Sequence, residues 1–105
     1  MIGAGANPAR GECALRVDGC ELVLRPSFQA LVAAEQELGS LFDLVARAAE
    51  GKLGIGELAA LFWHCLRELP EGMTRERLGE ALIGVGLAKL APVLRDLLHQ
   101  ILAGR

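Results

Sequence analysis

A short hairpin signal near the start of the chain constrains its fold more than any other feature. Asp18-Gly19 lies between two segments of alternating residues, and this dipeptide favours the two-residue turn that joins antiparallel strands. With this turn, one face of the hairpin carries only apolar side chains: Cys13, Leu15, Val17, Cys20, Leu22 and Leu24. The other face carries two pairs of opposite charge, Arg16 with Glu21 and Glu12 with Arg25. A shift by one residue would lose both features, so the sequence predicts a hairpin over residues 12–25.

Segments with helical periodicity follow the hairpin, which must pack on other elements because an isolated hairpin is marginally stable in water. The predicted helices cover residues 27–38, 40–51, 56–69, 75–85 and 87–103. Their predicted N-caps include Ser27, Ser40 and Thr74. The apolar face of the first helix is predicted from Phe28, Leu31, Val32, Glu35 and Leu38. Pro92 either marks the true start of the last helix or kinks it.

These elements predict a mostly α, α+β fold, in which the N-terminal two-stranded antiparallel hairpin packs on about five short helices. Residues 1–11 contain three glycines and a proline and are expected to form a flexible leader. Residues 12–105 are expected to form one domain, with the hairpin at 12–25 and a helical region at 27–103. A chain of 105 residues that is 52% hydrophobic can bury a core of its own without disulfide or metal.

Charge and composition exclude several classes of partner and place the chain in the cytoplasm. The formal net charge is -2, so nothing indicates binding to nucleic acid or to an anionic membrane. No apolar run reaches the roughly 18–20 residues of a membrane span, and no signal peptide is recognised. The three cysteines, Cys13, Cys20 and Cys65, are odd in number and agree with a reducing compartment.

The residues that could carry chemistry form no catalytic, cofactor-binding or metal-binding pattern. Gly3-x-Gly5 lacks the strand and helix that a phosphate-binding loop needs on either side. His64-Cys65 and the distant His99 do not form the spaced pairs typical of zinc ligands. Cys65 is predicted on a buried stripe while His64 points elsewhere, so a nucleophile and base pair is not expected. The sequence predicts a protein that is not an enzyme.

Trp63 is the side chain that best fits a contact with a partner protein. It follows Phe62 on a predicted helix, where neighbouring positions point about 100° apart, so only Phe62 can sit at the centre of the apolar stripe. Trp is enriched at interface hot spots. Burial of Trp63 under the hairpin or under the last helix is the alternative.

The order of elements and three segments around the hairpin resemble the gene transfer agent family of small phage-tail proteins. These segments are Asn7-Pro8-Ala9-Arg10-Gly11-Glu12, Leu24-Arg25-Pro26-Ser27-Phe28-Gln29-Ala30-Leu31 and Glu35-x-x-Leu38-Gly39-Ser40-Leu41. The resemblance covers roughly residues 7–103. Members of the family are similar to the tail assembly chaperones of long-tailed phages and are also labelled tail tube proteins. The family has no catalytic motif to carry over.

The resemblance implies a cytoplasmic, non-enzymatic helper that coats the apolar helices of the tape-measure protein until tail tube subunits replace it. An apolar groove that accepts an amphipathic helix would suit this role. We expect the groove near Trp63 and the outer edge of the last helix, around Leu97 and Ile101. The last helix could also pair with a copy of itself in a homo-oligomer. A minor structural subunit of the tail, such as a tube, connector or terminator protein, is the alternative, although one hairpin is too little sheet for a tube wall.

Overall fold

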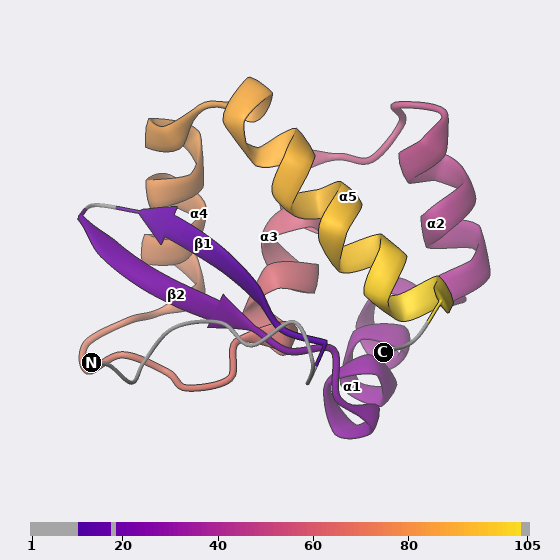
Figure 1. Cartoon of the computed structure of the whole chain (residues 1–105), viewed down its shortest axis with the longest axis horizontal. Coiled ribbons are helices and arrows are strands. Elements are labelled where there is room, and N and C mark those ends of the chain that lie inside the picture. Colours follow the sequence, from indigo (N-terminus) through magenta and orange to yellow (C-terminus); the bar gives the residue numbers. More distant parts are fainter. Residues whose placement is uncertain (1–10, 18, 104–105) are drawn as a thin grey trace.

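The N-terminal hairpin packs against helices as the sequence predicts, in a computed structural model that describes residues 11–17 and 19–103 (Figure 1). Strand β1 spans Cys13–Val17 and strand β2 spans Cys20–Leu24, antiparallel to each other. Cys13 pairs with Leu24 and Val17 with Cys20, which is the predicted register. Gly19 has a φ of 75°, the left-handed conformation that a tight hairpin turn requires. Asp18 and the leader up to residue 10 lie outside the described residues.

Five helices follow the hairpin, and side chains cap several of their first turns. The helices are α1 (Phe28–Leu38), α2 (Leu41–Ala49), α3 (Ile55–Cys65), α4 (Arg75–Val85) and α5 (Leu87–Ala103). The hydroxyl groups of Ser27, Ser40 and Thr74 each accept a hydrogen bond from the backbone amide of the third residue of α1, α2 and α4, respectively, which confirms these caps. Pro92 lies inside α5, so it does not mark the start of the helix.

The third helix ends four residues earlier than the periodicity predicts. After Cys65 the chain turns and runs beside β2, where Leu66 forms an isolated antiparallel bridge with Leu24. The Arg25 amide donates to the Cys65 carbonyl at 2.6 Å, and the Arg67 amide donates to the Val23 carbonyl at 2.8 Å. These bonds to an otherwise open strand edge replace the last helical turn. They also place the segment after α3 beside Val23. This side chain is buried although it points away from the apolar face of the hairpin.

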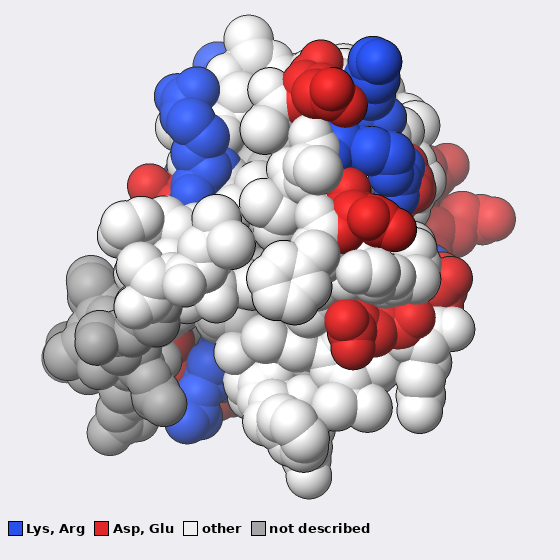
Figure 2. All heavy atoms as spheres, turned by 90° about the vertical axis from the view of Figure 1, so that its right-hand side faces the viewer, with Lys and Arg blue, Asp and Glu red and all other residues white. Residues whose placement is uncertain are grey.

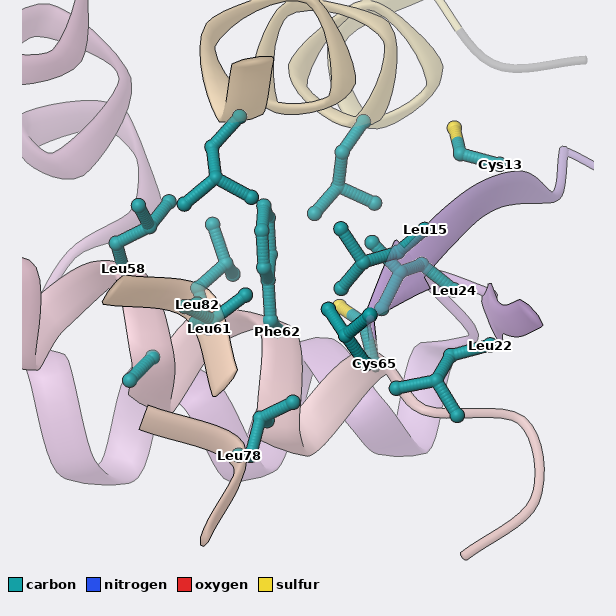
Figure 3. Packing of buried hydrophobic residues seen from close by; sticks show 14 of the residues in the cluster. Cys13, Leu15, Leu22, Leu24, Leu58, Leu61, Phe62, Cys65, Leu78 and Leu82 are labelled. Atoms are coloured by element: carbon teal, nitrogen blue, oxygen red, sulfur yellow. The ribbon is translucent and has the colours of Figure 1, made fainter. Parts of the chain in front are cut away.

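A single apolar core joins the hairpin to the helices. Figure 3 shows Leu15, Leu22 and Leu24 pointing from the strands toward Phe62 and Cys65 of α3. The largest side chains with almost no exposed surface come from β1, β2 and all helices except α1: Leu15, Leu24, Leu44, Leu61, Phe62, Leu78, Leu82, Leu90 and Leu97. The hairpin thus forms one wall of the core.

Two predictions about which side chains are buried were wrong. Helix α1 packs on α3 through Ala30 and Ala34, while Phe28 is 82% exposed and Val32 is also exposed. Small side chains let two helix axes approach closely, and a phenylalanine would hold them apart. On the hairpin, Cys20 is exposed although it lies on the predicted apolar face and its cross-strand partner Val17 is buried.

The cross-strand pair predicted between Glu12 and Arg25 is also corrected. The Glu12 side chain is fully buried and forms a salt bridge with Arg67 at 3.1 Å, whereas Arg25 is exposed. Arg67 reaches Glu12 because the segment after α3 runs along β2. The pair therefore depends on the early end of α3.

Candidate protein-binding surface

An open apolar groove of about 760 Å³ lies between α2 and α5. Helix α2 contributes one side and α5 the other, with Arg95, Asp96 and His99 also at the groove. Its apolar lining consists of Val45, Ala48, Ala49, Ala91, Leu94, Leu98 and Leu102. Figure 2 views the side of the molecule on which α2 lies, where uncharged side chains form a broad band and charged side chains gather at its margins.

The groove exists because α2 and α5 attach to the core through other faces. Helix α5 is anchored by Leu90 and Leu97, both almost completely buried. Leu94 and Leu98 occupy an adjacent stripe and are half-buried, while Leu102 is 61% exposed. Helix α2 is anchored by Leu44. The stripes beside these anchors face each other across the gap, so apolar side chains remain accessible.

Charged side chains of α2 and α5 lie at different distances from the groove. On α5, Arg95 and His99 are exposed one helical turn apart. On α2, Asp43 and Glu50 are exposed and seven residues apart, so both lie on the outer side of that helix. Arg47, which lies between them in the sequence, forms a bidentate salt bridge with Glu57 of α3. Its Nη1 atom lies 2.7 Å from Oε1 of Glu57, and its Nη2 atom lies 2.6 Å from Oε2. Glu57 therefore neutralises the charge of Arg47. Asp43 and Glu50 therefore lie on the side of α2 that faces away from the groove, whereas Arg95 and Asp96 of α5 lie at it.

Arg47 and the Gly54 amide also determine the ionisation of Glu57. Both donate hydrogen bonds to its carboxylate, and they lower its pKa from the ordinary value of 4.5. The same pairing raises the pKa of Arg47. This contact fixes α2 to the start of α3 and so holds one wall of the groove in place.

The three residues predicted to contact a partner lie in different surroundings. Leu97 is fully buried in the core, so its side chain is not open to a partner in this structure. Ile101, on the same helix, is partly buried against the core. Trp63 is half-buried on α3, with the guanidinium of Arg75 from α4 at 5.9 Å from its ring centre. The structure does not bring Trp63 to the stripe of α5 that faces the groove.

An ion cluster next to Trp63 ties three helices together. Glu37 of α1 accepts a hydrogen bond from His64 Nε2 of α3 at 2.8 Å and another from Arg75 of α4. Arg75 first, and then His64, lowers the pKa of the Glu37 carboxyl. His64 is therefore occupied by a structural contact, and Arg75 links this cluster to the tryptophan ring.

Two of the three cysteines, Cys13 and Cys65, are buried, and Cys20 is exposed. Burial, with a smaller contribution from Cys13, raises the pKa of the Cys65 thiol to about 12, so the nucleophilic thiolate is disfavoured. Burial and then Asp96 raise the pKa of Cys13. Within residues 11–17 and 19–103, no three His, Cys, Asp or Glu side chains come close enough to hold a metal ion. None of the helices in these residues has the length and apolarity needed to cross a membrane.

Sequence reasoning missed the contribution of α2 to the groove. Of the regularly spaced apolar residues Leu41, Leu44, Val45 and Ala48 of α2, only Leu44 is fully buried. Phe42 is 81% exposed and follows the spacing of Val45 and Ala49 at i+3 and i+7. That second apolar stripe was the available signal, because a short helix with apolar residues on two faces has one face left over after it packs on the core.

The described residues thus form a mostly helical domain with an accessible apolar groove between α2 and α5. Residues 10–104 match the family described as "Phage tail tube protein, GTA-gp10". The chain belongs to this gene transfer agent and phage-tail family. No curated protein and no solved structure matches the chain.

Proposed function

We propose that this protein is a tail assembly chaperone that binds apolar helices of the tape-measure protein in the cytoplasm before tail tube subunits take its place. The proposal specifies the role within the phage-tail family to which the chain belongs. The observation that supports it is the groove between α2 and α5, whose apolar lining is of the kind that binds an amphipathic helix.

The dimensions and lining of the groove support a helix as the bound element. The apolar stripe of α5 runs from Ala91 to Leu102, about 16 Å along the helix axis, or roughly three helical turns. Ala48, Ala49 and Ala91 leave room for the larger side chains of a visiting helix. The proposed contact keeps the outer side of α5 that the sequence indicated, with Leu98 and Leu102 in place of Leu97.

A minor structural subunit of the tail is the second candidate, and the description of the family as a tail tube protein favours it. The small sheet argues against a role in the tube wall. The described residues contain two strands, whereas a wall built from closed sheets needs many more. A connector or terminator subunit would not need a large sheet. Mature particles distinguish the two candidates, because a chaperone leaves before completion and a subunit stays.

Co-expression with the tape-measure protein tests the chaperone proposal. We expect the two proteins to co-purify, and Leu102→Asp to reduce the recovered tape-measure protein several-fold. Ile83→Asp is the matched control, because Ile83 is similarly exposed (67% against 61%) but lies on α4, away from the groove. Equal loss with both variants, or no loss with Leu102→Asp, would exclude the groove as the binding site. A tagged copy retained in mature tails would favour the structural subunit.

A further inference from the structure

We infer that α2 is a hinged wall of the groove, which pivots at Gly39 and is held against the core by the salt bridge between Arg47 and Glu57. The inference goes beyond the proposed function, because it concerns how the groove changes shape and holds for any partner. Figure 1 shows α2 at the periphery of the molecule, where a turn joins it to α1 and a loop joins it to α3.

Helix α2 is attached to the core by fewer buried side chains than any other helix in the described residues. Leu44 is the one residue of α2 that is buried, whereas α3 contributes six buried residues. Leu41 is partly buried against the core, but it lies at the start of the helix. Segments with few buried apolar contacts open at a lower free energy than the molecule as a whole. The half of α2 that follows Leu44 is therefore the part that separates most easily.

Gly39 provides a pivot at the start of α2. Its φ is 87°, a conformation that favours glycine, and a Cβ atom at this position would meet no atom within 4 Å outside its chain neighbours. The backbone can therefore rotate there without a clash. The Leu41 amide donates a hydrogen bond to Oε2 of Glu35 at 3.1 Å, which keeps the start of α2 beside α1. Rotation about this point moves the far end of the helix, where the loop of residues 50–54 leads to α3.

The salt bridge that holds the moving half is accessible to water. The side chains of Arg47 and Glu57 are 37% and 30% exposed, and ion pairs at such positions contribute little to stability. The Gly54 amide also donates to Glu57, so this carboxylate keeps a partner when Arg47 leaves. Arg47 in turn has Asp43 one helical turn earlier, and Asp43 adds to the effect of Glu57 in raising the pKa of Arg47. Both members of the salt bridge therefore have a partner in the open state.

The motion changes the width of the groove. The lining residues of α2 all follow Leu44 and so belong to the half that moves: Val45, Ala48 and Ala49. Helix α5 keeps its place because Leu90 and Leu97 anchor it in the core. Release of Arg47 from Glu57 therefore moves one wall of the groove relative to the other.

Hydrogen exchange of the backbone amides in the full chain, without any partner, tests the inference. We expect the amides of residues 45–49 to exchange through a shared local opening, with protection factors well below those of α3. Arg47→Gln should lower the protection of these amides roughly threefold and leave α3 and α5 unchanged, because it removes the salt bridge. Arg77→Gln is the matched control, because Arg77 also bonds from a helix to a neighbouring loop but lies on α4, and it should leave α2 unchanged.

A distance measurement separates a hinge motion from local unfolding. Spin labels at Glu50→Cys, at the end of α2, and at Lys89→Cys, on α5, occupy exposed positions, and Cys20→Ser removes the exposed native thiol. We expect two distances between the labels, with the longer one more populated in Arg47→Gln.

Every other outcome would overturn the inference. Amides of α2 that exchange only together with those of α3 would show that the helix has no opening of its own. Equal losses of protection in α2 and α3 with Arg47→Gln would indicate general destabilisation, and unchanged protection would show that the salt bridge does not hold the helix. A single, unchanged distance between the labels would exclude the pivot. Capture of the tape-measure protein is measured separately, so its failure would reject the proposed function alone.

Discussion

Glu12 and Arg67 are 55 positions apart in the chain, and their side chains meet at 3.1 Å with the carboxylate fully buried. The contact joins the residue before β1 to the segment that runs along β2 after α3. A buried carboxylate depends on its positive partner because the interior solvates charge poorly. This pair therefore fastens the hairpin to the helical part of the molecule.

We predict that Arg67→Met destabilises the protein by about 3 kcal/mol, because it removes the guanidinium that pairs with the buried Glu12 carboxylate. Glu12→Gln in the same chain should recover a substantial part of this loss, since the buried charge is then gone. Urea unfolding of the four members of this double-mutant cycle measures the coupling. Additive effects of the two substitutions would show that the pair contributes no interaction of its own.

The Glu37 cluster predicts a specific loss of stability in acid. Arg75 and His64 lower the folded-state pKa of Glu37, so its contribution is fully present above the ordinary value of 4.5 and disappears as the pH falls toward the folded value. Glu37→Gln should make the stability curve less steep below pH 4.5. Acid unfolding of Glu76→Gln, at an exposed position on α4, is the control and should follow the parent chain.

The three thiols should differ sharply in reactivity. Cys20 is exposed, whereas Cys13 and Cys65 are buried and burial raises the pKa of both. Titration with a disulfide reagent should modify one thiol per folded chain quickly and all three after unfolding. Cys20→Ser should remove the fast reaction. Rapid modification of a second thiol in the folded chain would contradict the burial of Cys13 and Cys65.

Three phenylalanines should respond very differently to truncation. Phe62→Ala removes a fully buried ring and should cost about 3–5 kcal/mol. Phe28→Ala and Phe42→Ala remove rings that are more than four-fifths exposed and should each change stability by about 0.5 kcal/mol or less. Thermal unfolding of the three variants makes the comparison. A large loss with Phe28→Ala would restore the original expectation that this ring packs on the core.

Local sequence patterns predicted most of the secondary structure, but they predicted less well which side chains are buried. The alternation around Asp18-Gly19 determined the strand register, and the hydroxyl caps located the starts of three helices. Both are interactions between near neighbours. The early end of α3 was not predictable in this way, because Leu66 pairs with Leu24 of β2, more than 40 residues earlier in the chain.

The candidate surface was harder to predict for a related reason. Periodicity identifies the apolar stripes of a helix, but it does not say which stripe the core will cover. Leu97 and Leu98 are neighbours on α5, yet one is fully buried and the other lines the groove. On α1, the alanines are buried and Phe28 is left outside because the neighbouring helix comes close. These choices depend on packing between elements, which a single helical pattern does not contain.

The bridge between Leu24 and Leu66 has a consequence for how the chain reaches its native state. It closes a loop that contains α1, α2 and α3, so forming it requires the ordering of about forty intervening residues at an entropic cost that grows with loop length. Contacts of such long range form late or limit the folding rate. The amides of Arg25 and Arg67 should therefore gain protection from hydrogen exchange after the helices have formed, and should lose it only when the whole molecule opens.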